Sequence, residues 1–514
     1  MPPSPFAYRR TPVKPLLTLG AFAAAASLAF GASAPADAAA SAAARPAKPN
    51  VVVVMTDDQD FRSMSTLPNV RKLVGDRGTQ FTTSVVNTPL CGPSRSTFLT
   101  GQYLHNHGVM WNDAPLGGYD KVDNANTLPV WMHRAGYRTI HVGKYVNGYG
   151  QDRPTEIPPG WDDWHGTVDP STYYYYDTTF NDNGKLTTYG TKPSDYSVDV
   201  ASRKADQAIR VASTKKKPFF LNLAPIAPHT QEAGDVRAEG TPALPAPRHM
   251  DEYAKAELPR LPNFDELDIS DKPATLARFY PNLLTDRQIS DLTQHYRGRM
   301  GSLLSVNDMV GKLVKTLKAT GQDKNTVVIF TSDNGWILGE HRINDPVTST
   351  GMAAGGKWVP FEGSSRVPLY MSGPGVPKGR KIPGVVTNAD VTSTIVALGG
   401  ARPTHPLDGR SLLPALKKPS VLDRRGVLIE ALSNPRSLPQ YQSVRTQRYR
   451  YDLQDDGAEG LFDLKVDPYE LTSFHADPRY AKIKAILRPY LLKLRGCKGK
   501  SCDVPVPKLP APGA

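Results

Sequence analysis

Cys91-Gly92-Pro93-Ser94-Arg95, followed by Leu99-Thr100-Gly101, is the stretch around which the rest of the sequence is organised. It predicts a turn that enters a helix, because Pro93 suits a first helical position, where its missing N–H costs nothing. Cys91 then lies at the helix N-terminus, where backbone N–H groups and the helix dipole favour negative charge. A cysteine there, or a group made from it, is a candidate nucleophile, and Arg95 adds a cation for an oxyanion. The alternative is a buried structural cysteine at a helix start.

Four short apolar runs predict strands that each end in polar residues. They lie at 50–56, 137–142, 217–223 and 326–331. Continuous apolar runs of this length are typical of parallel strands that are buried on both faces. In open α/β sheets, ligands bind outside the carboxyl ends of the strands. We therefore expect one pocket, beside Cys91, that is lined by the polar residues after these runs: Asp57, Asp58, Lys144, His229, Asp333 and Asn334.

The residues that follow the first and last of these runs are oxygen ligands. Asp57, Asp58, Asp333 and Asn334 offer carboxylate and amide oxygens without sulfur or imidazole, which favours Ca²⁺ or Mg²⁺ over zinc. Because Ca²⁺ accepts irregular carboxylate geometry more easily, we expect Ca²⁺, with Mg²⁺ as the other choice. The alternative interpretation of Asp333-Asn334-Gly335 is a plain turn.

The first 40 residues read as an export signal. Basic residues that include Arg9-Arg10 precede an apolar run at 16–31, and Ala36-Asp37-Ala38 fits a small-x-small cleavage site. The twin arginine is compatible with the Tat route, and the missing Phe-Leu after it leaves the Sec route open. An Ala/Pro linker follows at 41–49. No later stretch is long and apolar enough to span a bilayer, so we expect a secreted, extracellular protein without a membrane span.

Composition is that of a large globular enzyme, with 514 residues, 39% hydrophobic and 22% charged. The net charge of +13 is uneven, since residues 482–514 hold eight Lys or Arg and one acid. No helix-turn-helix, zinc-finger or RNA-binding pattern accompanies this charge, so we expect no nucleic-acid partner. Of three cysteines, Cys497 and Cys502 suit a small disulfide loop outside the cell, which leaves Cys91 as the odd one.

The sequence changes character near residue 420. Short alternating runs between 427 and 453 predict antiparallel strands, and 478–494 predicts a helix. We therefore expect a main catalytic domain at 50–420 and a smaller α+β subdomain with a basic tail at 421–514.

The cysteine stretch, Cys-x-Pro-Ser-Arg with its spaced Leu-Thr-Gly, resembles the first signature of the sulfatases. Residues 136–144, Gly-Tyr-Arg-Thr through Gly-Lys, are similar to the second signature. Other landmarks of the family lie at 361–363, 366–368, 407–409, 461–464 and 467–468. The likeness is greatest to the N-acetylglucosamine-6-sulfatases, through residues 105–107, 144–147, 160–161 and 303–308. It covers nearly the whole chain after the leader.

The resemblance implies an alkaline phosphatase-like α/β fold. Such a fold has a large mixed, mostly parallel sheet between helices and a smaller C-terminal α+β subdomain with an antiparallel sheet. It also implies that a formylglycine-generating maturation enzyme oxidises Cys91 to formylglycine (3-oxoalanine), which joins the metal ligands. The hydrate of that aldehyde would attack the sulfur of an anionic sulfate monoester, either a sulfated sugar or an aryl sulfate.

Hydrolysis of a sulfate ester needs cations for the sulfuryl oxygens and an acid for the leaving group. Arg95, Lys144 and Lys357 are the candidate cations, and His229 is the candidate acid. Many sulfatases carry a histidine two or three residues after the signature lysine, whereas this chain has Val146 and Asn147. Asn147 is able to hydrogen-bond in the site but is unable to act as a base. His341 is a candidate for the base, and the alternative for His341 is a surface residue after a turn.

The tyrosines at 173–176 admit a sugar-stacking interpretation. Four successive residues cannot share one face of a strand or helix, so we expect an exposed edge strand or loop there.

Two alternatives stand beside a sulfatase. One is a phosphonate or phosphate monoester hydrolase with the same nucleophile. The other is an inactive protein that keeps the fold to bind sulfated glycans.

Overall fold

Strand β1 (Asn50–Thr56) is the central element of the computed structural model, which describes residues 48–231, 241–344, 356–432 and 440–513. Every residue of β1 is buried, and its side chains alternate between two hydrophobic clusters, as the two-residue period of a strand requires. Val51 and Val53 pack in one cluster, and Val52 and Val54 pack in the other. The apolar run is therefore a strand covered on both faces, as its sequence predicts.

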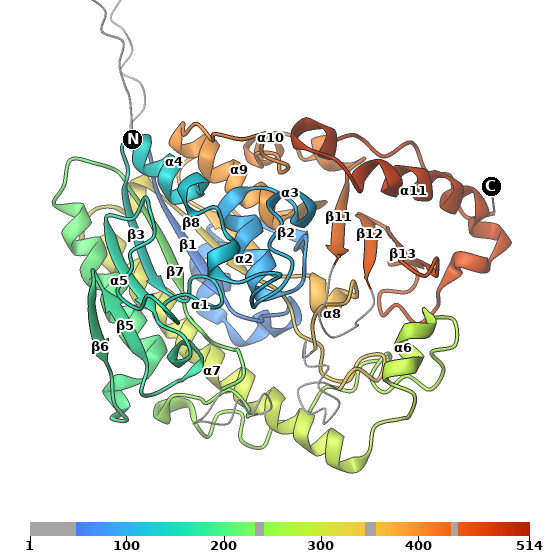
Figure 1. Cartoon of the computed structure of the whole chain (residues 1–514), viewed down its shortest axis with the longest axis horizontal. Coiled ribbons are helices and arrows are strands. Elements are labelled where there is room, and N and C mark those ends of the chain that lie inside the picture. The colour runs from blue at the N-terminus through green and yellow to red at the C-terminus, as the bar shows by residue number, and fades with distance from the viewer. Residues whose placement is uncertain (1–47, 232–240, 345–355, 433–439, 514) are drawn as a thin grey trace, which may run out of the picture. The chain divides into compact units, whose positions relative to one another are not determined.

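β1 belongs to a ten-stranded sheet (Figure 1). In sheet order its strands are β10 (Arg380–Thr387), β2 (Gly78–Val85), β9 (Leu369–Ser372), β8 (Thr326–Ser332), β1, β7 (Phe219–Ala224), β3 (Arg138–Gly143), β4 (Asp163–Thr167), β5 (Thr179–Asp182) and β6 (Lys185–Thr188). β1 pairs in parallel with β7 and β8, and β3 pairs in parallel with β7 and β4. β9 runs antiparallel between β2 and β8, and β5 and β6 add an antiparallel edge. The sheet is thus mixed, with a parallel centre.

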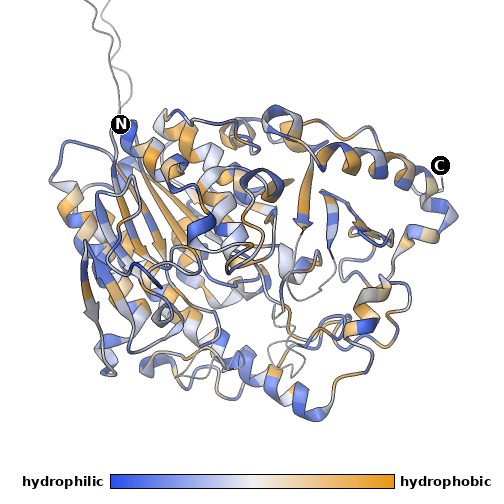
Figure 2. Ribbon diagram, viewed as in Figure 1, coloured by the Kyte–Doolittle hydropathy of each residue, from blue (hydrophilic) through white to orange (hydrophobic). Residues whose placement is uncertain are grey.

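Helices cover both faces of this sheet. On one face lie α2 (Cys91–Thr100), α4 (Leu128–Arg134) and α9 (Asn388–Gly399), and on the other lie α5 (Ser197–Ser213) and α7 (Asp286–Ala319). α7 starts at a capping box in which the Thr285 side chain and Gln288 bond each other's backbone. The shorter helices are α1 (Pro68–Val70), α3 (Leu104–His107), α6 (Ala274–Phe279), α8 (Glu362–Ser365) and α10 (Leu413–Lys417). Figure 2 shows the central strands as the most hydrophobic part of the ribbon, between these helices.

The C-terminal part holds a four-stranded antiparallel sheet of β11 (Gly426–Ala431), β12 (Tyr441–Thr446), β13 (Tyr449–Gln454) and β14 (Glu459–Asp463). Helix α11 (Ala481–Leu494) packs on this sheet through an apolar face that includes Ile483, Leu487 and Leu491. After α11, Cys497 and Cys502 form the predicted disulfide.

A partly buried network of polar side chains links the disulfide loop (497–502) to α3. His105 Nδ1 lies 2.8 Å from Glu430 Oε1, and His105 Nε2 lies 2.8 Å from the carbonyl oxygen of Cys497. Asn106 Nδ2 donates to that carbonyl and to Asp408 Oδ2, both at 2.8 Å. Both ring nitrogens lie within hydrogen-bond distance of an acceptor, and Asn106 Nδ2 also lies 3.2 Å from Nε2. Burial lowers the pKa of His105, but the hydrogen bond and charge of Glu430 outweigh it and raise that pKa above its usual value.

The observed architecture confirms the predicted fold class. Pro93 occupies the third position of α2 rather than the first, because the helix begins at Cys91. Lys48–Ala514 form one compact unit, and the domain boundary near residue 420 stays a prediction. The leader predicted at 1–40 lies outside the described residues. Among the residues that are described, no helix has the length and apolar character needed to cross a membrane.

Candidate active site

Two neighbouring strands bring acidic residues to one edge of the large sheet. β1 and β8 pair in parallel along their whole length, so the residues that follow them lie side by side. The backbone N–H of Asp58 donates to Asp333 Oδ1 at 3.0 Å, and Asn334 Nδ2 donates to Asp58 Oδ1 at 2.6 Å. Asp58 adopts φ +65°, a left-handed conformation that is uncommon outside glycine. These residues and Asp57 are buried.

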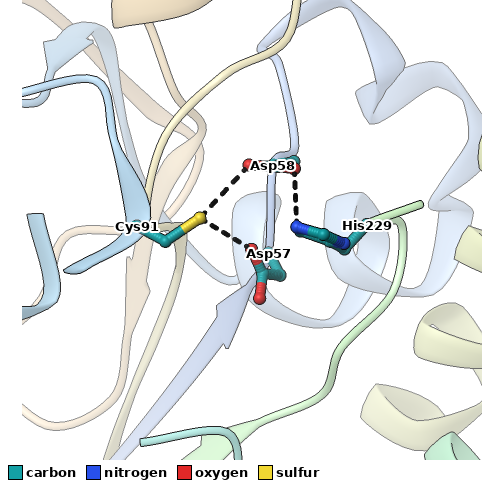
Figure 3. Close-up of side chains that lie close together, drawn as sticks. All are labelled: Asp57, Asp58, Cys91 and His229. Carbon is teal, nitrogen blue, oxygen red and sulfur yellow. Dashed lines mark hydrogen bonds and ion pairs between the residues drawn. The ribbon is translucent and has the colours of Figure 1, made fainter. Parts of the chain in front are cut away.

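Helix α2 directs its first residue at these acids. Cys91 Sγ lies 3.5 Å from Asp57 Oδ1 and 3.7 Å from Asp58 Oδ1 (Figure 3). Sγ also accepts a hydrogen bond from Lys357 Nζ at 3.0 Å. The cysteine therefore meets the carboxyl end of β1, where the rule for open α/β sheets locates a ligand site.

Two buried lysines neutralise the acids after β1. Lys144, which follows β3, holds its Nζ 2.6 Å from Asp57 Oδ2. Lys357 Nζ donates to both oxygens of Asp58, at 2.7 and 3.0 Å. Each acid after β1 is thus paired with its own ammonium group.

Arg95 ties the acids to the end of β3. Its Nε donates to Asp333 Oδ2 at 2.8 Å, and its Nη2 lies 3.3 Å from Asp57 Oδ2. Its Nη1 donates to the carbonyl oxygens of Lys144 and Tyr145, at 2.9 and 3.3 Å. The guanidinium group is therefore occupied by protein acceptors, and its observed action is to order the acids.

Burial and the crowding of charge shift the pKa values in this cluster. Burial would raise the pKa of Asp57, but Lys144 and Arg95 outweigh it and hold that pKa far below its usual range. Burial and the charge of Asp57 raise the pKa of Asp333 to about 6. Burial also raises the pKa of the Cys91 thiol far above its usual range. An unmodified Cys91 therefore holds little thiolate near neutral pH.

His229 follows β7 and faces the same acids. Its Nε2 lies 3.5 Å from Asp58 Oδ2, and its Nδ1 lies 2.7 Å from the carbonyl oxygen of Thr230. Because a carbonyl oxygen only accepts, Nδ1 carries the proton of the neutral ring and Nε2 faces the site. Burial lowers the pKa of His229 to about 4, against the opposing charges of Asp58 and Asp57.

Several possible metal ligands lie close together. One ligand atom each from Asp57, Asp58, Cys91 and His229 lies within 4.8 Å of all the others, and two of these atoms are carboxylate oxygens. Asn334 Oδ1 is buried and has no hydrogen-bond partner among the described residues. Rotation of the Asn334 amide by a half-turn would exchange Oδ1 with Nδ2. Oδ1 would then lie next to Asp58 Oδ1, where Nδ2 lies now. Carboxylate and amide oxygens together are the ligands that Ca²⁺ and Mg²⁺ prefer.

Asn147 reaches the site through a tyrosine. Its Nδ2 donates to the Tyr173 hydroxyl at 2.7 Å, and the Tyr173 ring lies 5.1 Å from the His229 ring and 4.7 Å from Lys144 Nζ. The expectation that residues 173–176 form an exposed edge or loop is wrong for Tyr173 and Tyr175, which are buried. The Tyr175 hydroxyl donates to the His229 carbonyl at 2.8 Å, so these rings fix the histidine.

Arg299 of α7 is a site residue that the sequence does not reveal. It is fully buried, its Nη2 donates to the carbonyl oxygen of Asp58, and its Nη1 donates to that of Pro228 at 3.3 Å. Its Cζ lies 5.3 Å from the ring of Trp336. Since Pro228 precedes His229, one guanidinium group joins the loop after β1 to the loop after β7. Its one signal in the sequence is a charge among apolar residues such as Met300 and Leu303 of α7.

His341 lies in a different environment from the acids. Its Nδ1 is 2.6 Å from Glu266 Oε2, Asn263 Nδ2 approaches its Nε2 at 3.3 Å, and its ring stacks on Phe361 at 4.2 Å. It is fully buried, so it is not the surface histidine of the alternative interpretation. None of its described contacts is with the acids after β1 and β8, so the geometry gives no support to His341 as a base.

Comparison with known proteins gives consistent matches along the chain. A sequence model of the family described as Sulfatase matches residues 49–401, and one described as N-sulphoglucosamine sulphohydrolase, C-terminal, matches residues 356–496. The N-acetylglucosamine-6-sulfatase of Homo sapiens is 30% identical over 506 residues, which are 89% of this chain and 86% of that protein. An extracellular sulfatase Sulf-1 homologue of Caenorhabditis elegans is 34% identical over 380 residues, 72% of this chain, which spans about half (49%) of that relative. A solved structure in complex with its substrate D-glucosamine-2-N,6-O-disulfate has a TM-score of 0.69 at 22% identity, and the match covers 88% of this chain and 98% of that one.

Proposed function

The chain belongs to the sulfatase family and is an enzyme that hydrolyses sulfate esters, and from this premise we propose that its nucleophile is made from Cys91 beside a divalent cation. The observation that carries the proposal is the contact of Cys91 Sγ with two buried carboxylates and with Lys357 Nζ. Hydrolysis of a sulfate ester needs a nucleophile, cations for the sulfuryl oxygens and an acid for the leaving alcohol. The cluster contains a candidate for each.

The proposed nucleophile is the hydrate of formylglycine at position 91. Its support is the family signature around Cys91 together with the contacts of Sγ with two carboxylates and Lys357 Nζ. A hydrate has a hydroxyl group that occupies the place of Sγ, at the N-terminus of α2 and beside Lys357. Maturation of Cys91 by a formylglycine-generating enzyme is part of the proposal.

The proposed metal is Ca²⁺, with Mg²⁺ as the alternative. Its ligands would be the oxygens after β1 and β8: Asp57, Asp58, Asp333 and Asn334. The position made from Cys91 would complete the set. When bound, a divalent cation polarises the sulfuryl oxygens and lowers the pKa of the attacking hydroxyl group. The buried acids and the partnerless Oδ1 of Asn334 support this assignment.

The chain's own residues divide the remaining work. Lys144 and Lys357 would bind the sulfuryl oxygens, and the support is that their ammonium groups lie at the acids beside Cys91. Arg95 acts on Asp57 and Asp333 and so holds the site in shape. Asn147 would orient the Tyr173 ring, which lies beside His229, through its hydrogen bond to the Tyr173 hydroxyl.

His229 would protonate the leaving alcohol at Nε2. That nitrogen faces the acids, while Nδ1 is fixed by the Thr230 carbonyl oxygen. A bound sulfate ester adds negative charge beside the ring, which favours the protonated form of His229.

The proposed substrate is a sulfated sugar, and specifically a 6-O-sulfate on a glucosamine unit. The human relative's name and the substrate of the solved neighbour support this class. The extracellular relative supports secretion, which the predicted leader at 1–40 also favours.

Peptide mass spectrometry across 90–95, on protein secreted by its native host, tests the nucleophile. We expect the mass of an aldehyde at position 91, and an unmodified thiol throughout would contradict the proposal. Cys91→Ala should reduce turnover of an aryl sulfate to background. Ser96→Ala is the matched control, because Ser96 lies in the same helix, bonds the Gly92 carbonyl at 2.8 Å and does not contact the cluster, so this variant should keep its turnover.

Matched esters separate the alternatives. A sulfatase turns over an aryl sulfate faster than the corresponding aryl phosphonate or phosphate, and the reverse order would favour a phosphonate or phosphate monoester hydrolase. A matured protein that binds sulfated sugar without turnover of any of these esters would be a binding protein.

A further inference from the structure

A cavity of about 500 Å³ opens beside the small antiparallel sheet. Four separate segments line it: 423–425 before β11, the turn 446–449, 464–465 after β14, and 506–510 near the C-terminus. We call this cavity the C-terminal groove. Its last segment belongs to the basic stretch 482–514, which has no part in the catalytic cluster.

Cations dominate the walls of the C-terminal groove. Two of them are neutralised, because Arg448 pairs with Asp463 at 2.6 Å and Arg425 pairs with Asp390. Three exposed cations form no ion pair with any described residue: Arg424, Lys465 and Lys508. Asp423 is the one acid among the lining residues. The groove therefore presents uncompensated positive charge to solvent, which attracts anions.

The rest of the lining is mostly apolar and offers no exposed aromatic face. Val506, Leu509 and two prolines contribute to it. Its one aromatic residue, Tyr449, is 2% exposed, and the guanidinium carbon of Arg448 lies 4.9 Å from the Tyr449 ring. Nucleic-acid bases bind to accessible aromatic rings, so this lining suits them poorly. A sulfated sugar has apolar C–H faces and anionic substituents, which match an apolar floor with cationic walls.

Strand β11 separates the C-terminal groove from the catalytic cluster. The groove lies at its start, next to Arg425, whereas Glu430 near its end donates its N–H to the Asn87 carbonyl at 2.8 Å. Asn87 lies just before Cys91 in the chain. Six strand residues span about 20 Å at about 3.3 Å each. A single sugar is therefore too short to contact both places, and a polymer of several units is long enough.

We propose that the C-terminal groove binds a sulfated polysaccharide chain at a second, non-catalytic site. The proposal rests on the proposed function, because it takes the polymer to be one that also presents sulfate esters to the catalytic cluster. Binding at the groove makes attack on a sulfate of the same chain effectively intramolecular. It therefore lowers KM for a polymer while it leaves kcat and the turnover of small esters unchanged.

Three variants test the groove. The first is Arg424→Ser, Lys465→Ser, Lys508→Ser. The second changes only Lys465 and Lys508 to serine. It keeps the hydrogen bond from Arg424 Nε to the Val506 carbonyl oxygen at 2.9 Å, so residues 506–510 stay attached to the groove. The control is Lys215→Ser, Lys216→Ser, Lys217→Ser, which removes the same charge from exposed positions between α5 and β7. Binding is measured with heparin as the probe and unsulfated hyaluronan for comparison, over a series of salt concentrations.

We expect heparin affinity to fall in both groove variants. The slope of log affinity against log salt should fall by about 2 to 3 in the triple variant, if each lost contact removes about 0.7–0.9 as it does for nucleic acids. Turnover of a small aryl sulfate should stay at the wild-type value. Heparin binding that is equal in the wild type and the groove variants, or lost equally in the control, would overturn the proposal. A larger loss of binding to phosphatidylglycerol vesicles or DNA than to heparin would assign the groove to another class of ligand and also overturn it. Absence of aryl sulfate turnover in the wild type would instead contradict the proposed function.

Discussion

Replacing Arg299 by methionine is the sharpest test of how the site is held together. The substitution keeps the length of the side chain and removes the guanidinium group that bonds the carbonyl oxygens of Asp58 and Pro228. A hydrogen bond from a charged donor contributes about 1.5–3 kcal/mol. Two such bonds are lost, and relief from burying a charge offsets part of that loss. We expect the free energy of unfolding to fall by about 3 kcal/mol.

The effect on catalysis should exceed what lost stability alone explains. Arg299 joins the loop of Asp58 to the loop of His229, and a displacement of about 1 Å between reacting groups costs about 100-fold in rate. We expect kcat/KM for an aryl sulfate to fall about 10- to 100-fold at a temperature where the variant is fully folded. The affinity for Ca²⁺, measured by calorimetry, should fall with it. Arg299→Lys, which keeps the charge and one donor direction, should be intermediate.

Arg138→Met is the control for stability. It removes an ion pair to Asp163 at 2.9 Å, at the start of β3 and therefore at the opposite end of the strand from Lys144. This variant should lose stability and keep kcat/KM. If Arg299→Met lost stability yet kept kcat/KM and Ca²⁺ affinity within about twofold, Arg299 would be a packing residue and the reasoning would fail.

Three further results are expected. Dialysis against EDTA should lower both Tm and aryl sulfate turnover, and Ca²⁺ should restore them more fully than Mg²⁺; unchanged activity after complete removal would exclude a metal at these acids. The pKa of His105 is raised in the folded protein, so its contribution to stability is complete below about pH 6.5 and is lost as pH rises through the folded pKa. The difference in Tm between the wild type and His105→Gln should therefore shrink with rising pH. Replacing Cys497 and Cys502 by serine should cost about 2 kcal/mol in urea unfolding for so short a loop, and no loss would mean that the polar network alone holds it.

The sequence predicts which residues at the ends of the parallel strands belong to the site. Asp57, Lys144 and His229 each follow an apolar run, and the common direction of parallel strands brings them to one edge. The start of α2 is equally local, since Cys91 precedes a proline and small polar residues. These predictions depend on residues that are adjacent in the chain, which is why pattern alone suffices.

The contributions of long-range packing are not visible in the sequence. Arg299 lies in a long helix, and nothing beside it indicates that its guanidinium group reaches two loops. Tyr173 and Tyr175 lie in a run that fits no regular face, and their burial depends on loops that fold over them. His341 is the opposite case. Its position in the sequence suggests a catalytic base, but in the fold its ring contacts Glu266 and Phe361.

The burial of Cys91 sets a time limit on its chemistry. Its sulfur contacts Lys357, which lies 266 residues later in the chain, and none of the cysteine is exposed once that contact exists. At about 5–20 residues per second, synthesis of that stretch takes roughly 13 to 53 s. The maturation proposed for Cys91 would have to take place within this interval, because the folded chain buries the whole side chain. On that proposal, whether a molecule is able to turn over substrate is decided before it has finished folding.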